Sequence, residues 1–78
     1  MTFQRRVEHL GDLITLCQRH PGFLAILPTD ERLAIAYILE RIDLLHEIGV
    51  SLYDIADGIV IPEWLEACHF VKATAKAA

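Results

Sequence analysis

Apolar residues recur at helical spacing in every segment of this 78-residue chain. Residues 2–20 illustrate the pattern, because their apolar positions follow one another three or four residues apart: Phe3, Val7, Leu10, Ile14 and Cys17. This spacing places the side chains on one face of an α-helix. The only run of β-branched residues is 59–61. The sequence therefore predicts an all-α fold.

Glycine and proline residues divide the pattern into separate helices. We expect long helices over 2–20 and 30–48, a short helix over 51–58, a C-terminal helix from 62 to about 75, and one extra helical turn at 23–27. Thr2 suits an N-cap, Ser51 and Asp54 suit a capping box, and Pro62 suits the first position of a helix. The prediction is a small bundle of about four helices, two long, one short and one C-terminal. It forms a single domain over residues 1–78, with a frayed tail from about residue 73.

The helix expected over 30–48 is apolar around most of its circumference. Its polar strip is narrow and consists of Arg32, Ala36, Glu40, Asp43 and Glu47. Hydrophobic residues make up 54% of the chain, above the ~45–50% of an average soluble domain, and a chain this short has little interior. A helix of this kind lies at the centre of a bundle or between subunits. We therefore expect a two-fold homodimer formed through the two long helices.

Acidic residues concentrate in the second half of the chain. Between Glu40 and Glu66 there are seven acids and one base, Arg41, and the whole chain has a net charge of −4. This balance disfavours binding to the phosphate backbone of nucleic acids. The acids either keep an apolar protein soluble or dock on a basic partner surface. The candidate partner-binding residues are Glu40, Asp43, Glu47, Tyr37 and Trp64.

Cysteine and histidine residues are the remaining candidates for metal binding and for catalysis. Cys17 and His20 share a helix face, and Cys68 with His69 would complete a set of four zinc ligands. Neighbouring residues on a helix point about 100° apart, however, so the second pair does not face one ion. A cysteine nucleophile with a histidine base needs a substrate cleft, for which the chain has little room. We expect reduced core thiols, with a disulfide between the two cysteines as the alternative, and no cofactor, metal or catalytic residue.

Residues 49–70 allow an alternative function. Residues 49–56 are similar to the first helix of a helix-turn-helix motif, and residues 62–70 would be the second helix. That second helix would bring Glu63 and Glu66, but no lysine or arginine, to the major groove. A DNA-binding transcriptional regulator is therefore the alternative, and binding to nucleic acid is the less favoured hypothesis.

A set of spaced residues resembles the core pattern of the Hha/YmoA family. The pattern reads Asp30-x-x-Leu33-Ala34-x-x-Tyr37, then Leu44, Leu52-Tyr53-Asp54 and Trp64. Members of that family are small helical modulators that bind a nucleoid-structuring protein. The resemblance implies a small protein that acts on another protein.

No apolar stretch matches a targeting or membrane segment. The longest, residues 33–39, has seven residues, whereas a membrane helix needs about 20, and the first residues lack the apolar run of a secretory signal. We expect a cytoplasmic protein without membrane contact. The sequence favours a small non-enzymatic regulator that binds and modulates another protein, as an inhibitor or adaptor, and that forms a homodimer.

Overall fold

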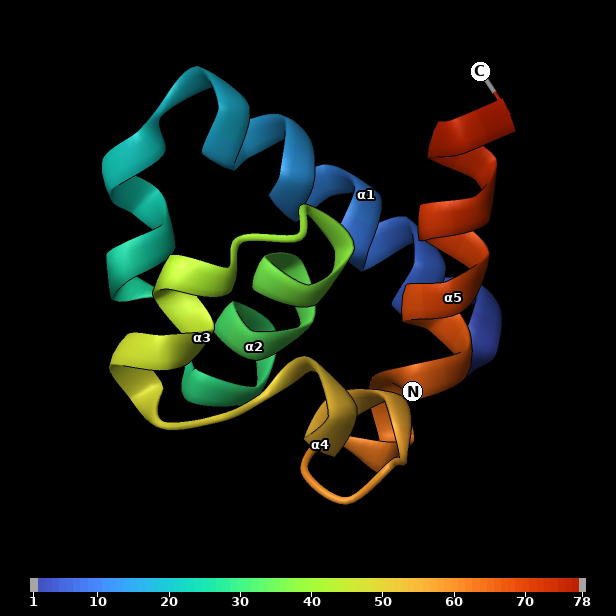
Figure 1. The fold of residues 1–78 in the computed structure, drawn as a ribbon. Helices are drawn as coiled ribbons and strands as arrows, with labels where there is room; N and C mark the ends of the chain where they lie inside the picture. Colours follow the sequence, from blue (N-terminus) through green and yellow to red (C-terminus); the bar gives the residue numbers. More distant parts are fainter. Residues whose placement is uncertain (1, 78) are drawn as a thin grey trace.

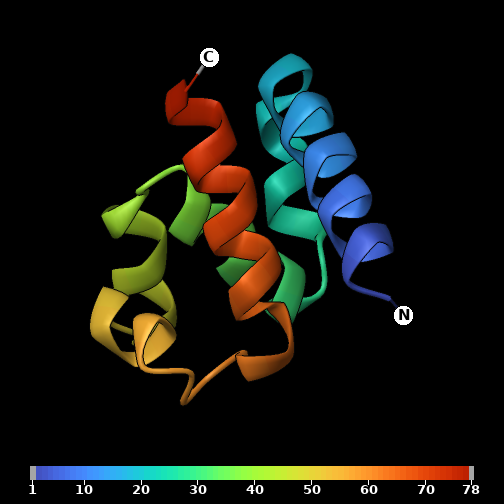
Figure 2. The same cartoon turned by 90° about the vertical axis from the view of Figure 1, so that its right-hand side faces the viewer.

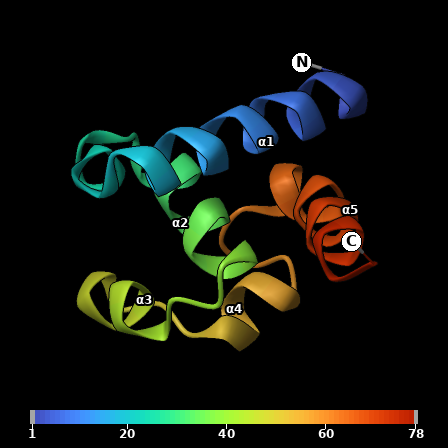
Figure 3. The same ribbon diagram turned by 90° about the horizontal axis from the view of Figure 1, so that it is seen from above.

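The computed structural model describes the backbone of residues 2–77 and the side chains of residues 2–74. It confirms the predicted all-α bundle (Figure 1). The elements are α1 (Phe3–Arg19), the 3₁₀ helix η1 (Pro21–Ile26), α2 (Thr29–Ile38), α3 (Ile42–Ile48), α4 (Leu52–Ala56) and α5 (Pro62–Ala77). Viewed from above, α2 lies in the middle, with α1 on one side and α3 and α4 on the other (Figure 3). The α5 helix packs against α1 and α2 (Figure 2).

The predicted helix starts are confirmed. The Thr2 hydroxyl accepts a hydrogen bond of 3.2 Å from the backbone N–H of Arg5. The backbone N–H of Asp54 donates to the Ser51 hydroxyl, and the backbone N–H of Ser51 donates to the Asp54 carboxylate, both at 3.1 Å. Pro62 is the first residue of α5. The first two starts follow from local hydrogen bonding, because each cap satisfies backbone donors that the first helical turn leaves unpaired. The third follows from the fixed φ and the missing N–H of proline.

The single long helix predicted over 30–48 is wrong. The chain leaves the helical path after Ile38 and starts α3 at Ile42. Glu40 adopts a left-handed backbone conformation with φ of 55°. The backbone N–H of Arg41 donates to the carbonyl of Ala36 at 2.8 Å, which closes the turn. Residues 29–48 thus form two helices of ten and seven residues.

This break allows the two halves of the apolar segment to cover each other. An unbroken helix of this length would be about 28 Å long, as long as the whole molecule, which measures 29 Å in its largest dimension. Instead α3 folds back and packs on α2, and Leu45 of α3 is only 1% exposed. Ala36, which we expected in the exposed polar strip, is fully buried. The helix at the centre is therefore covered by its own chain.

Side chains from every helix and from η1 contribute to one core. Residues 33–38 of α2 are all buried, and α5 contributes Trp64, Ala67 and Cys68. Of the side chains that the structure describes, no charged or hydrophilic one belongs to the buried class. The extra helical turn predicted at 23–27 is confirmed as η1, whose Leu24 enters this core.

Both cysteines are free, buried thiols, as predicted. Burial raises the pKa of Cys17, and it raises the pKa of Cys68 to about 12, with the nearby Lys72 opposing the second shift. The Cys68 thiol lies 4.0 Å from the carbonyl oxygen of Ala34 on α2. Such thiols act as small hydrophobic groups that pack α5 on α2.

The last helix is longer than the sequence suggested. It extends to Ala77, so residues 73–77, predicted to fray, continue the helix, and Ala78 lies outside the described residues. Within residues 2–77, no helix combines the length and the apolar character that crossing a bilayer requires.

Candidate protein-binding site

The predicted acidic strip lies on the surface at the turn before α3 and along α3. Glu40, Asp43 and Glu47 are all exposed. Arg41 donates two hydrogen bonds to the Asp43 carboxylate, at 3.1 and 3.0 Å, and this contact lowers the pKa of Asp43. The Glu40 carboxylate lies 3.2 Å from the ammonium group of Lys72. Two of the three acids thus have a cation beside them within the chain, which weakens the strip as a binding surface.

Tyr37, predicted to contact a partner, is a core residue. Its side chain is 7% exposed, and its hydroxyl lies 3.0 Å from Nε2 of His69. The ammonium group of Lys72 sits 4.7 Å from the centre of its ring. The residue joins α2 to α5, because its ring is apolar and its hydroxyl finds a partner at the core edge, and it leaves little surface for another protein.

Trp64, the other aromatic residue predicted to contact a partner, is also buried. Its side chain is 6% exposed, and its indole N–H donates to the Asp30 carboxylate at 3.2 Å. The imidazole of His9 lies 6.0 Å from its ring, and Arg6 lies 5.9 Å from it. The indole thus anchors the start of α5 to the start of α2 and to α1.

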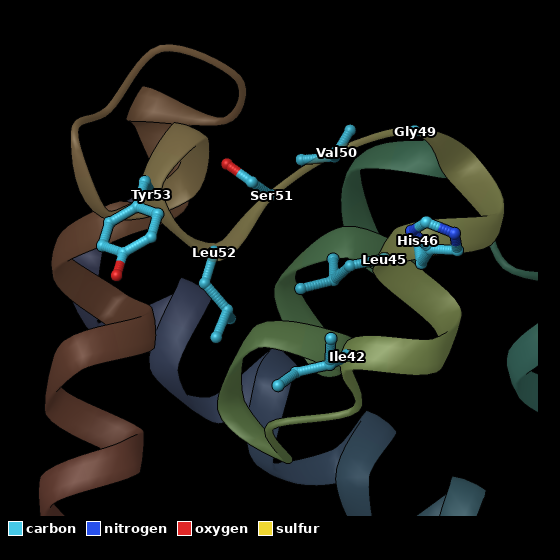
Figure 4. Close-up of a pocket in the computed structure, with 8 residues that line it drawn as sticks. All are labelled: Ile42, Leu45, His46, Gly49, Val50, Ser51, Leu52 and Tyr53. Atoms are coloured by element: carbon cyan, nitrogen blue, oxygen red, sulfur yellow. The ribbon is translucent and has the colours of Figure 1, made fainter.

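An apolar groove between α3 and α4, which sequence analysis missed, is the larger concave feature of this face. It has a volume of about 520 Å³. Figure 4 shows Ile42 and Leu45 projecting from α3 toward Leu52 of α4. The lining also includes His46, Val50 and Tyr53. We call this feature the α3–α4 groove.

The chain between the two helices fixes the shape of the groove. Gly49 ends α3 in a left-handed conformation with φ of 86°, which only glycine adopts without strain. The backbone N–H groups of Gly49 and Val50 both donate to the carbonyl of Leu45 at 3.0 Å. The capping box of Ser51 and Asp54 then starts α4 at once. Because these bonds hold the connection, α3 and α4 diverge at a defined angle and leave the groove between them.

The rim of the groove exposes two large apolar side chains. Ile42 is 60% exposed and Tyr53 is 79% exposed, whereas Leu45 at the floor is 1% exposed. Other exposed apolar side chains lie elsewhere, such as Ile26 on η1 and Phe70 on α5. Ile42 and Tyr53 lie together at one concave site, which makes the groove the candidate binding surface.

The chain segment that forms the groove is acidic. Residues 42–57 contain four carboxylates, those of Asp43, Glu47, Asp54 and Asp57, and no lysine or arginine. Asp54 is held in the capping box. Glu47 and Asp57 are exposed, and neither has an ion pair with any residue that the structure describes. None of the four carboxylates lines the groove itself, and Glu47 lines a hollow on the other side of α3. The groove is thus an apolar hollow within an acidic segment of the chain.

A second hollow of about 250 Å³ lies on the other side of α3. Its lining mixes Arg32 and Arg41 with Glu47. The guanidinium of Arg32 donates to the carbonyls of Ala25 and Leu27, at 3.1 and 2.9 Å. This arginine therefore holds η1 against α2, and the hollow is smaller and carries mixed charges.

The zinc set and the helix-turn-helix are the other arrangements that the sequence allowed. Among the described side chains, no three of histidine, cysteine, aspartate or glutamate lie close enough to hold one metal ion. The helices considered for a helix-turn-helix are α4 and the first half of α5, and Glu63 and Glu66 are exposed on α5. An exposed acidic face there opposes contact with a phosphate backbone.

Comparison with family models, with curated proteins and with solved structures finds no match to this chain. The resemblance to the Hha/YmoA family therefore gains no support from these comparisons. The functional argument rests on the groove and its surroundings.

Proposed function

We propose that this chain is a small non-enzymatic interaction protein, which binds another protein at the α3–α4 groove and modulates it as an inhibitor or adaptor. The observation that carries the proposal is the exposure of Ile42 and Tyr53 at the rim of an apolar groove. Tyrosine is enriched among the residues that dominate binding energy at protein interfaces. Burial of an aliphatic side chain such as Ile42 removes about 1.5–3 kcal/mol of unfavourable contact with water.

The acidic residues contribute in a different way. Glu47 and Asp57 lie outside the groove floor and are exposed to solvent. Charges in such positions raise the association rate and select partners of opposite charge, and they add less to the affinity. Within the predicted strip, Glu47 thus takes the leading role, while Asp43 and Glu40 are already close to cations of the same chain.

We also propose that the chain forms a homodimer, at a different surface from the one first expected. The apolar residues of α2 are buried within their own chain, so α2 offers no apolar face to a second copy. Phe3 of α1 and Phe70 of α5 are 45% and 52% exposed, and their rings meet edge to face at 5.8 Å. This aromatic pair supports an interface across α1 and α5. Light scattering of wild type and of Phe70→Ser tests the dimer: loss of a dimer in the variant supports it, and a wild-type monomer at ~100 µM contradicts it.

The binding function is tested by quantitative affinity capture from the source cells. We expect one protein whose recovery falls about tenfold or more with Ile42→Ser, because the substitution removes apolar surface at the rim. The matched control is Ile26→Ser, which changes a 72% exposed isoleucine on η1 and should leave the recovery unchanged. Circular dichroism confirms that both variants fold. If every captured protein is recovered equally with both variants, the proposed function is wrong.

A further inference from the structure

We propose that the occupant of the α3–α4 groove is a basic amphipathic α-helix of the partner protein. This inference rests on the proposed function and specifies the partner at the same site. It follows from three features of the groove: its apolar lining, the bonded state of its backbone N–H groups, and the acidic character of the segment that forms it.

The apolar lining suits a partner whose apolar side chains all project from one face. Ile42, Leu45 and Leu52 face the space between α3 and α4, as Figure 4 shows. Its volume of about 520 Å³ leaves room for side chains of a partner. A helix places residues i, i+3, i+4 and i+7 on one face, and such anchors fill a groove between two helices. The shape of the groove thus suits one helical face.

The backbone of the groove wall favours a helix over an extended segment. The N–H groups of Gly49, Val50 and Ser51, which form the connection, are already bonded within the chain. No strand edge exists within residues 2–77. An extended segment laid on this lining would find no free N–H group in the connection for its own C=O groups, at a cost of about 1–3 kcal/mol for each one buried without a donor. A helix satisfies its own backbone and avoids that cost.

The charges determine the chemistry of the helix. Because residues 42–57 carry four carboxylates and no lysine or arginine, a partner helix with acidic flanks would be repelled. Lysine or arginine beside the apolar face would be attracted by the negative charge of this segment, in which Glu47 and Asp57 have no ion pair with a described residue. Opposite charges steer the encounter and discriminate against acidic helices.

A second copy of this chain is a poor occupant. Its basic residues at the start of α1, Arg5 and Arg6, belong to a helix whose apolar face, including Leu10 and Leu13, is buried in the chain's own core. The α5 helix, which carries Lys72, likewise uses Trp64 for its own packing. Either helix would have to leave its fold before its apolar face could enter the groove.

Synthetic peptides of about 18 residues test the inference directly. The first peptide is an amphipathic helix with leucine on one face and lysine on the other. The second replaces every lysine by glutamate, and the third keeps the composition of the first but disperses the leucines around the helix. We expect fluorescence anisotropy to show binding of the first peptide at least about tenfold tighter than that of the other two. Circular dichroism should show that it becomes helical when bound.

Variants of the protein locate the site. We expect Ile42→Ser to weaken the leucine–lysine peptide about tenfold, and Glu47→Gln combined with Asp57→Asn to weaken it about threefold to tenfold and to reduce its dependence on salt. The matched controls are Ile26→Ser and Asp12→Asn, which change exposed residues on η1 and α1. Both controls should bind the peptide like wild type.

Several results would overturn the inference. They are equal binding of the three peptides, no binding of the first peptide, or binding that Ile42→Ser leaves unchanged. Self-association of the wild type that Ile42→Ser abolishes would assign the groove to a second copy. If no peptide binds while affinity capture still depends on Ile42, only this inference fails. If affinity capture also shows no dependence on Ile42, both this inference and the proposed function fail.

Discussion

The α2 and α3 helices come from one segment that the sequence predicts as a single apolar helix, yet their side chains differ in burial. Residues 33–38 of α2 are all buried, whereas in α3 only Leu45 is buried and Ile42 is 60% exposed. The difference arises at residues 39–41, where the chain turns and folds back. Apolar character alone therefore does not tell which side chains hold the fold and which are available to a partner. The position of each helix in the bundle decides that.

The sharpest test of this difference compares two isoleucines on either side of the turn. Ile35 is fully buried, so Ile35→Ala should lower the free energy of unfolding by about 2–5 kcal/mol. Ile42→Ala should change it by no more than about 0.5 kcal/mol, because its side chain makes few contacts. Urea denaturation monitored by circular dichroism measures both values. Equal losses would show that α3 is as enclosed as α2.

Thiol reactivity gives a second comparison of the enclosed and open regions. Burial raises the pKa of Cys68 to about 12, so at pH 8 its thiolate is scarce and its sulfur is covered by α2. A cysteine introduced by Ile42→Cys should react with a disulfide reagent about 100-fold faster than Cys68. Mass spectrometry of the labelled peptides separates the two sites. Comparable rates would contradict the enclosed position of α5 on α2.

The same pKa shift sets a pH dependence of stability. An unfolded cysteine has a pKa of about 8.5, so the folded state holds the Cys68 proton more tightly than the unfolded state does. The resulting contribution to the free energy of unfolding is complete below about pH 8.5. It is lost as the pH rises toward about 12, the pKa of Cys68 in the folded state. Urea denaturation at pH 8 and pH 10 should show a fall in wild type that is smaller in Cys68→Ala. An equal fall in both proteins would mean that this thiol does not titrate differently on folding.

The turn between α2 and α3 is tested by two substitutions at one residue. Glu40 has φ of 55°, a conformation that glycine adopts freely and alanine only with strain. Both Glu40→Gly and Glu40→Ala lose the contact with Lys72, so their difference isolates the backbone. We expect the glycine variant to be more stable than the alanine variant by about 1 kcal/mol in urea denaturation. A more stable alanine variant would indicate a continuous helix through residue 40.

The smallest effect concerns the ion pair that begins α3. Arg41 and Asp43 meet on the exposed surface with two hydrogen bonds, and exposed ion pairs contribute about 0–1 kcal/mol. Arg41→Gln should change thermal stability very little. It should, however, tighten binding of the leucine–lysine peptide slightly, because Asp43 is then available to the partner. Weaker binding in this variant would assign the arginine itself to the interface.

Local signals allowed much of the fold to be predicted. The caps at Thr2 and Ser51 and the start at Pro62 depend on neighbours within a few residues, so the sequence alone reveals them. The turn at residues 39–41 contains neither glycine nor proline, and it forms because a 78-residue chain covers two short apolar helices better than one long helix. No local rule predicts that outcome.

The candidate site was harder to predict, for related reasons. Tyr37 and Trp64 carry both apolar and polar groups, and the sequence does not show that His69 and Asp30 satisfy their polar ends within the fold. The acidic residues were recognised, but the groove beside them depends on the angle between α3 and α4. Gly49 before the Ser51 capping box was the available signal, because it marks a sharp reversal between two helices.

A titration of isotope-labelled protein with the leucine–lysine peptide, followed by two-dimensional ¹H–¹⁵N NMR, tests the central claim most directly. The claim is that the open side of the bundle at α3 and α4 receives a basic helix. We expect the backbone signals that move to cluster at residues 42–53, with those of residues 33–38 nearly unchanged. Signals that move mainly in α1 or α5, or that do not move at all, would contradict it.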